Sequence, residues 1–242
     1  MKQGRFQILE NKSIAKDVML MRLLGDTSDI KRPGQFVNIS LDGLYLRRPI
    51  SVCDREGDTL TLIYKVVGKG TEQMRSMENG SLDILTGLGN GYDTSKSGDK
   101  PLLIGGGVGV PPLYLLAKEL LSEGKSVSVI MGFNTENEVF GEEMFSCLGA
   151  KVTVCTVDGS RGVKGFVTDA LADRRYSYVY TCGPESMLKA VCGRTSTSGQ
   201  YSFEERMGCG FGACMGCSCK TKYGNMRICK DGPVLEKEAI IW

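Results

Sequence analysis

Four cysteines near the C-terminus constrain this chain more than any other feature. The segment CGFGACMGC sets Cys209, Cys214 and Cys217 at C-x4-C-x2-C spacing, and Cys229 follows after eleven further residues. This spacing is typical of the four thiolates that hold a plant-type [2Fe–2S] centre. The interleaved glycines leave the backbone free to wrap a small cluster and to turn its amides toward sulfur. We therefore expect these four cysteines to be cluster ligands.

Two other interpretations of the cysteines remain open, a zinc site and a set of buried free thiols. Zinc commonly uses a two-residue spacer in each half of its site, and the four-residue spacer after Cys209 does not match that pattern. A fifth cysteine, Cys219, lies close by in the sequence. We favour Cys229 over Cys219 as the fourth ligand.

The absence of histidine excludes several functions. None of the 242 residues is a histidine, so Ser-His-Asp or Cys-His catalysis and His-ligated zinc, haem or Rieske centres are ruled out. With 30 basic and 28 acidic side chains the net charge is +2, so we expect neither nucleic acid nor a membrane as partner. The apolar stretch 101–121 is broken by glycines and prolines, and no signal peptide is evident. We expect a cytoplasmic protein whose ten cysteines serve metal or redox chemistry.

Residues 1–97 are rich in short β-type runs. Apolar and β-branched residues gather in three such runs, at 36–40, 49–52 and 60–64, and turn residues separate them. This pattern predicts a small antiparallel β-barrel or a sandwich, followed by one short helix over 71–77. The polar stretch at 93–100 has the composition of a linker between domains.

Residues 98–200 alternate between strand and helix patterns. The predicted strands are 102–104, 127–131, 152–157 and 178–181. The predicted helices are 111–123, 138–147, 165–173 and 184–192. Such alternation predicts a Rossmann-like, doubly wound parallel sheet. The tail, 201–242, fits neither pattern, and we expect it to form a third domain around the cysteines.

A glycine-rich turn between the first strand and helix of this region points to a dinucleotide site. Its glycines are Gly105, Gly106, Gly107 and Gly109, and prolines open the following helix. The exposed amides of a helix start bind pyrophosphate, although the match to G-x-G-x-x-G is partial and a purely structural turn remains open. The next strand ends near Glu136 and Glu138 with no arginine or lysine beside them, which favours NAD over NADP.

Two further motifs are weaker when taken alone. Cys182, Gly183 and Pro184 end a later strand, where small residues leave room for a flat ring, although an ordinary turn explains them equally. RRPIS at 47–51 is followed downstream by IYK and by a Gly-Thr pair. An arginine and a hydroxyl beside a helix start can grip a second pyrophosphate, and a solvated basic pair is the simpler alternative.

Together these motifs resemble the electron-transfer subunits of bacterial type B dihydroorotate dehydrogenases, iron–sulfur flavoproteins of the ferredoxin–NADP reductase superfamily. RRPIS and the cysteine tail with its DGPV ending are the specific parts, whereas GGGVGVPPL is shared across the superfamily. The resemblance covers essentially the whole chain. It implies an FAD-binding barrel over 1–97, an NAD-binding Rossmann-like domain over 98–200 and a [2Fe–2S] domain over 201–242.

The resemblance also implies roles for individual residues. Those that would line the isoalloxazine and pyrophosphate of FAD are Arg48, Pro49, Ile50 and Ser51. Those that would contact its adenine nucleotide or ring edge are Ile63, Tyr64 and Lys65. Gly70 and Thr71 would hold its pyrophosphate, and Cys182 would lie near the nicotinamide. The cluster ligands would be Cys209, Cys214, Cys217 and Cys229, where the short span before the last ligand departs from the family.

The function that the resemblance implies is electron transfer within a larger complex. A partner subunit carrying FMN would oxidise dihydroorotate, and electrons would pass through the cluster and FAD to NAD+, in a heterotetramer of two subunits of each kind. One alternative is a subunit of a different flavin and iron–sulfur enzyme, of the ferredoxin:NADP or sulfur reductase type. Another is a redox sensor or assembly module without catalytic activity.

Overall fold

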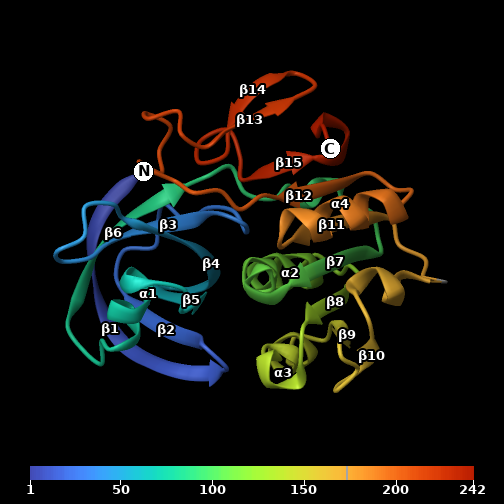
Figure 1. Cartoon of the computed structure of the whole chain (residues 1–242), viewed down its shortest axis with the longest axis horizontal. Helices are drawn as coiled ribbons and strands as arrows, with labels where there is room; N and C mark the ends of the chain where they lie inside the picture. Colours follow the sequence, from blue (N-terminus) through green and yellow to red (C-terminus); the bar gives the residue numbers. More distant parts are fainter. Residues whose placement is uncertain (173) are drawn as a thin grey trace.

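The computed structural model describes residues 1–172 and 174–242. Its N-terminal part is a closed barrel in the order β1-β2-β5-β4-β3-β6, and every neighbouring pair is antiparallel (Figure 1). The barrel strands are β1 (Lys2–Ala15), β2 (Val18–Leu24), β3 (Phe36–Ser40), β4 (Arg48–Glu56), β5 (Thr59–Lys65) and β6 (Ser81–Leu88). The predicted antiparallel barrel is confirmed.

The barrel forms around side chains that alternate along its strands. In β2, Met19, Met21 and Leu23 point into the core, while Arg22 and Leu24 are exposed. The single helix of this part, α1 (Lys69–Arg75), lies between β5 and β6 and begins two residues before the predicted start. It begins there because the Thr71 hydroxyl accepts the backbone N–H of Val67 at 2.9 Å and of Gly68 at 3.2 Å.

The second part of the chain builds one seven-stranded sheet. Its order is β10-β9-β8-β7-β11-β12-β15, parallel throughout except for the last strand. The strands are β7 (Pro101–Gly106), β8 (Ser128–Phe133), β9 (Lys151–Thr156), β10 (Val163–Lys164), β11 (Tyr178–Cys182), β12 (Gly199–Ser202) and β15 (Val234–Glu236). The central strands are nearly continuous apolar runs because both faces are buried.

Helices cover both faces of the sheet, as a doubly wound fold requires. On one face, α2 (Pro112–Ser122) and α3 (Glu142–Cys147) pack against residues such as Leu103 and Met131. On the other, α4 (Glu185–Arg194) packs against residues such as Ile104. The predicted Rossmann-like sheet is confirmed.

Two predicted helices are shorter in the structure. The helix expected over 138–147 is reduced to α3, because Gly141 adopts a left-handed conformation (φ 80°) that separates it from a 3-10 turn at Glu136–Glu138. The segment 165–173 contains only a 3-10 helix at Val167–Leu171, and residue 173 lies outside the described residues. The segment at 93–100 is packed rather than free, since Ser97 is buried and the Tyr180 hydroxyl donates to the Asp93 carbonyl at 2.8 Å.

The tail does not stand apart from the sheet. Its strands β12 and β15 extend the sheet edge, and β13 (Ser218–Thr221) pairs with β14 (Gly224–Arg227) as a hairpin. Figure 1 shows the segment between β12 and β13 crossing from the sheet to the top of the barrel. Among the described residues, no helix has both the length and the apolar character needed to cross a bilayer.

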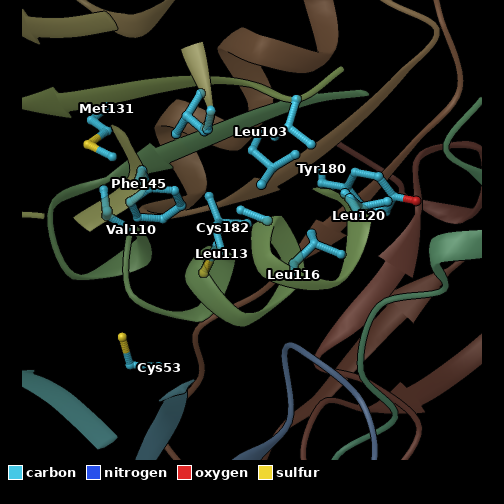
Figure 2. Packing of buried hydrophobic residues seen from close by; sticks show 14 of the residues in the cluster. Cys53, Leu103, Val110, Leu113, Leu116, Leu120, Met131, Phe145, Tyr180 and Cys182 are labelled. Carbon is cyan, nitrogen blue, oxygen red and sulfur yellow. The ribbon is translucent and has the colours of Figure 1, made fainter. Parts of the chain in front are cut away.

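Helix α2 sets the distance between barrel and sheet. Figure 2 shows Leu113 and Leu116 of α2 next to sheet residues such as Leu103, with Cys53 of β4 on the side of the helix away from the sheet. Lys118 of α2 reaches the carboxylate of Asp54 on β4 at 3.1 Å. One helix therefore packs against both parts and fixes their relative position.

We predict that Leu113→Ala lowers the free energy of unfolding by about 2–5 kcal/mol, because it leaves a cavity in this shared core. Leu113 is fully buried, whereas Leu24 is 43% exposed and provides the matched control. Urea denaturation followed by circular dichroism measures both variants. Equal losses of stability in Leu113→Ala and Leu24→Ala would contradict the assignment of α2 to the core.

Candidate functional site

Two cavities meet between the barrel and the sheet. One, of about 610 Å³, lies at the carboxyl ends of the parallel strands, where ligands bind in open α/β sheets. The other, of about 400 Å³, lies on β4 and β5 of the barrel. Lys65, Val108 and Glu204 line both. We call them the sheet cavity and the barrel cavity, and their shared wall means that two bound groups could touch.

The barrel cavity gathers most of the residues that RRPIS and IYK singled out. The wall residues among them are Arg48, Pro49, Ile50, Ser51, Ile63, Tyr64, Lys65 and Thr71. Gly70 does not line the cavity, but it makes room for the side chain of Arg48, which does. A Cβ on Gly70 would lie only 2.1 Å from Nε of Arg48. The arrangement leaves a guanidinium beside the start of α1.

Cys182 lines the barrel cavity rather than the sheet cavity. Its side chain is almost completely buried, and this burial raises the pKa of the thiol far above its usual range. A thiol in this state is protonated at neutral pH and acts as a small, uncharged wall group. It has no thiolate character with which to act as a nucleophile.

The glycines of the turn differ in their surroundings. Gly106 and Gly107 line the sheet cavity, as does Pro184. Gly105, Gly109 and Gly183 do not line it, and they permit close packing instead. A Cβ on Gly109 would lie 2.2 Å from the Cys182 carbonyl oxygen, so no larger residue fits between the turn and β11.

The charges on the sheet cavity favour a dinucleotide without an extra phosphate. Its lining contains one cation, Lys65, and two carboxylates, Glu138 and Glu204. Lys65 Nζ lies 3.9 Å from Oε1 of Glu138, and Oε2 of the same carboxylate accepts a hydrogen bond from the side-chain amide of Asn134 at 2.9 Å. Glu136 does not line the cavity. Among the described residues no arginine lines this wall, and its one lysine already faces Glu138, so a 2′-phosphate would meet two carboxylates and only this shared cation.

Two residues that line the cavities belong to none of the sequence motifs. Phe166 lines the sheet cavity with 64% of its surface exposed, which offers an aromatic face to a ligand ring. Glu204 follows β12 by two residues and lies on the shared wall. Recognition of β12 as a sheet strand would have pointed to Glu204, because residues just beyond parallel strands line such sites. Nothing in the sequence signals the exposure of Phe166.

The four predicted ligand cysteines lie in two pairs. The backbone amides of Ala213 and Cys214 donate to Sγ of Cys209 at 3.2 and 3.4 Å, and the amide of Cys229 donates to Sγ of Cys217 at 3.3 Å. Among the residues that the structure describes, no three His, Cys, Asp or Glu side chains converge as they would on a single metal ion. Two pairs suit a two-iron centre better, because each iron takes two thiolates.

The surroundings of these cysteines fit a cluster. Burial acts to raise the pKa of Cys209, but backbone hydrogen bonds from Cys214 and its neighbours outweigh it and lower the pKa to about 6. Burial and the nearby thiols of Cys217 and Cys209 raise the pKa of Cys229 to about 12, so the two pairs are within electrostatic reach. A Cβ on Gly208 would lie 3.2 Å from Sγ of Cys214, which explains a glycine in this cradle.

Cys219 is placed elsewhere. It lies on β13 opposite Met226 and lines neither the sheet cavity nor the barrel cavity, but a third cavity of about 240 Å³ between the hairpin, α4 and the C-terminal residues, which adjoins the other two at Glu204. Burial raises the pKa of its thiol. All ten cysteines, every one of them in the described part of the chain, are free thiols.

Comparison with known proteins identifies two domain families. Residues 204–241 match the iron–sulfur cluster binding domain of dihydroorotate dehydrogenase B. Residues 103–193 match the oxidoreductase NAD-binding domain. These matches confirm that an NAD-binding domain is followed by an iron–sulfur domain at the C-terminal end. The zinc interpretation of the tail has no support from these matches.

Curated relatives extend over the whole chain. One from Lysinibacillus sphaericus is 42% identical, with 99% of this chain and 98% of the relative covered. Another from Fusobacterium nucleatum is 43% identical, with 93% of each covered. Both carry the name dihydroorotate dehydrogenase B (NAD(+)), electron transfer subunit.

Solved structures agree with this fold. A chain from the structure of an NADH-dependent reduced ferredoxin–NADP oxidoreductase, described for flavin-based electron bifurcation, superposes with a TM-score of 0.88 at 29% identity and covers 98% of this chain and 90% of its own. The flavohemoglobin of Malassezia yamatoensis, with bound FAD and heme, superposes with a TM-score of 0.69 at 19% identity over 80% of this chain and 56% of its own, which shows the fold alone. On the curated relatives, this chain belongs to the family of electron transfer subunits of dihydroorotate dehydrogenase B (NAD+).

Proposed function

We propose that this chain passes electrons between a catalytic partner subunit and NAD+ as the electron transfer subunit of a dihydroorotate dehydrogenase B complex in pyrimidine biosynthesis. The observation that carries the proposal is the shared wall of the barrel and sheet cavities, with a four-cysteine segment next to the same barrel. Family membership supports it over the full chain. A redox sensor would have no use for the second cavity.

Three groups supply the chemistry when bound: nicotinamide exchanges a hydride, a [2Fe–2S] centre exchanges single electrons, and FAD does both. We assign FAD to the barrel cavity. Arg48 would pair with its pyrophosphate, and the apolar side chains of Pro49 and Ile63 would pack on its rings. The protonated Cys182 thiol would exclude water from this wall without adding charge. The protein holds and orients these rings, so the lack of histidine is no obstacle.

We assign NAD to the sheet cavity. Gly106 and Gly107 would allow its pyrophosphate close to the backbone, and Phe166 would stack on its adenine. Lys65 is the cation on this wall. Its ammonium group would move away from Glu138 and pair with the phosphates of NAD. The cluster would be held by the four cysteines as two pairs. One iron would be bound by Cys209 and Cys214, and the other by Cys217 and Cys229.

The partner in this proposal is an FMN-containing subunit that oxidises dihydroorotate to orotate. The complex would contain two copies of each subunit. We place it in the cytoplasm, the compartment in which cysteines that form no disulfide stay reduced.

One observation favours a second candidate. A chain of an NADH-dependent reduced ferredoxin–NADP oxidoreductase superposes with a TM-score of 0.88, so the same architecture occurs in an enzyme with another reaction. In that case the partner would be a larger subunit with further iron–sulfur clusters.

Co-purification separates the two candidates. We predict that the chain, expressed with its native partner, elutes with an FMN-binding subunit, and that dihydroorotate reduces NAD+ only when both subunits are present. The measurement is NADH formation at 340 nm together with flavin analysis of the complex. A large partner with several [4Fe–4S] clusters, and no orotate formation, would favour the second candidate instead.

The Arg48 assignment predicts that Gly70→Ala weakens FAD binding about tenfold or more, the expected loss for one charge-assisted contact. The new methyl group would collide with Nε of Arg48 and displace the guanidinium. Gly68→Ala is the matched control, because a Cβ at Gly68 meets nothing within 4 Å. Flavin fluorescence titration of the apoprotein measures both. Unchanged affinity in Gly70→Ala would remove Arg48 from the FAD site.

The ligand assignment predicts that Cys229→Ser loses most of its iron and acid-labile sulfide, while Cys219→Ser keeps the wild-type content. A serine at position 229 removes one of four thiolates, whereas Cys219 lies in another cavity. Chemical analysis and visible absorbance of anaerobically purified proteins provide the measurement. Loss of iron in Cys219→Ser with retention in Cys229→Ser would reverse the assignment.

A further inference from the structure

Two asparagine side chains of the barrel hold the cysteine segment. Asn90, just beyond β6, donates from Nδ2 to the carbonyls of Val234 at 2.7 Å and Asp231 at 3.2 Å, and its Oδ1 accepts the N–H of Val234 at 3.1 Å. Asn38, on β3, donates from Nδ2 to the carbonyl of Cys209 at 3.1 Å. Asn90 therefore fastens the chain beyond the last cysteine, whereas Asn38 fastens the first cysteine itself.

The contact of Asn38 with the cysteine segment is close. Its side chain is 1% exposed, and Gly210 lies directly against it. A Cβ on Gly210 would lie 2.4 Å from Nδ2, and the φ of +79° at this residue also favours glycine. The Cys209 carbonyl fixes the orientation of the Asn38 amide, because the two oxygens would repel each other if Oδ1 faced this carbonyl in place of Nδ2.

Stability alone does not explain an asparagine at this position. Oδ1 of Asn38 is buried, and no described residue donates a hydrogen bond to it. An unpaired buried oxygen opposes folding, and an apolar side chain of the same shape would avoid that penalty. We therefore attribute the asparagine at this position to its Nδ2 group, which donates the hydrogen bond that holds Cys209.

Asn38 also adjoins the barrel cavity. In the β3–β4 ladder it pairs with Pro49, which lines that cavity. Arg47 braces the strand, since its guanidinium donates to the Asn38 carbonyl at 3.3 Å and pairs with the Asp83 carboxylate at 2.6 Å. A single braced residue thus links the wall proposed for FAD to the first cysteine of the proposed cluster.

We propose that Asn38 is a positioning residue for electron transfer: its amide holds Cys209 against the barrel and thereby fixes the cluster relative to the flavin. This inference rests on the proposed function. NADH would first reduce the flavin by hydride transfer. In the step concerned, the reduced flavin would then lose one electron at a time and the cluster would gain it, with no covalent bond between them. Electron tunnelling slows steeply with distance. If the cysteine segment lost its contact with Asn38 and moved away from the barrel, electron transfer to the cluster would therefore slow, while NADH and FAD binding would be unchanged.

Hydrogen exchange of the holoenzyme tests the positioning directly. In Asn38→Leu we expect the amides of residues 208–216 to exchange about fivefold faster, the factor that corresponds to the loss of one hydrogen bond. Asn90→Ala is the matched control, and it should speed exchange over residues 230–234 while 208–216 remain as in the wild type. Wild-type exchange over 208–216 in Asn38→Leu would overturn the proposal.

Stopped-flow absorbance with NADH tests the consequence. We expect flavin reduction at the wild-type rate and cluster reduction slowed severalfold in Asn38→Leu and in Asn38→Asp. The aspartate also adds a negative charge near the cluster, so a redox titration should show a lower cluster potential in Asn38→Asp than in Asn38→Leu.

The outcomes separate this inference from the proposed function. Wild-type cluster reduction in both Asn38 variants, or loss of flavin together with the cluster, would overturn the positioning role and leave the proposed function intact. A wild-type protein that contains no iron, or whose flavin NADH does not reduce, would instead refute the proposed function.

Discussion

Lys65, Val108 and Glu204 belong to two cavities at once, and the other features of the molecule depend on that shared wall. Hydride transfer requires contact between the two rings that exchange it, so a flavin site and a nicotinamide site must open into each other. Helix α2 makes this possible, because it packs against the sheet on one side and against β4 on the other and so fixes the distance between the two parts. The close packing of Gly109 on the Cys182 carbonyl keeps the glycine turn at the edge of the sheet where the parallel strands end.

The cysteine segment is joined to this framework at both ends. Its strands β12 and β15 extend the sheet, and Asn38 and Asn90 fasten it to the barrel. Backbone amides aimed at Cys209 lower the pKa of that thiol to about 6 against the effect of burial, and a lowered pKa suits the ligand role that we propose for it. A chain that only positions redox groups needs no general base, which agrees with a sequence that has no histidine.

Local sequence patterns were enough to predict the strands of the parallel sheet and to single out the four cysteines, because these signals come from residues close together in the chain. The barrel needed the family resemblance as well, since its closure pairs β1 with β6, residues that are far apart in the sequence. Helix lengths were less predictable, since a single left-handed glycine, Gly141, shortened α3. The sequence did not predict strand β15, because a strand of three residues is too short to show the alternation of apolar and polar residues. The contact between Asn38 and Cys209 joins residues 171 positions apart, so only the folded structure brings them together.

The most direct test of this account is an anaerobic titration of the purified chain with NADH, followed by absorbance and electron paramagnetic resonance. The account predicts that NADH bleaches a flavin band and then produces the signal of a reduced [2Fe–2S] centre. A bleached flavin with no cluster signal would contradict a connection between the two sites. A protein with iron and sulfide but no flavin band would contradict the assignment of FAD to the barrel.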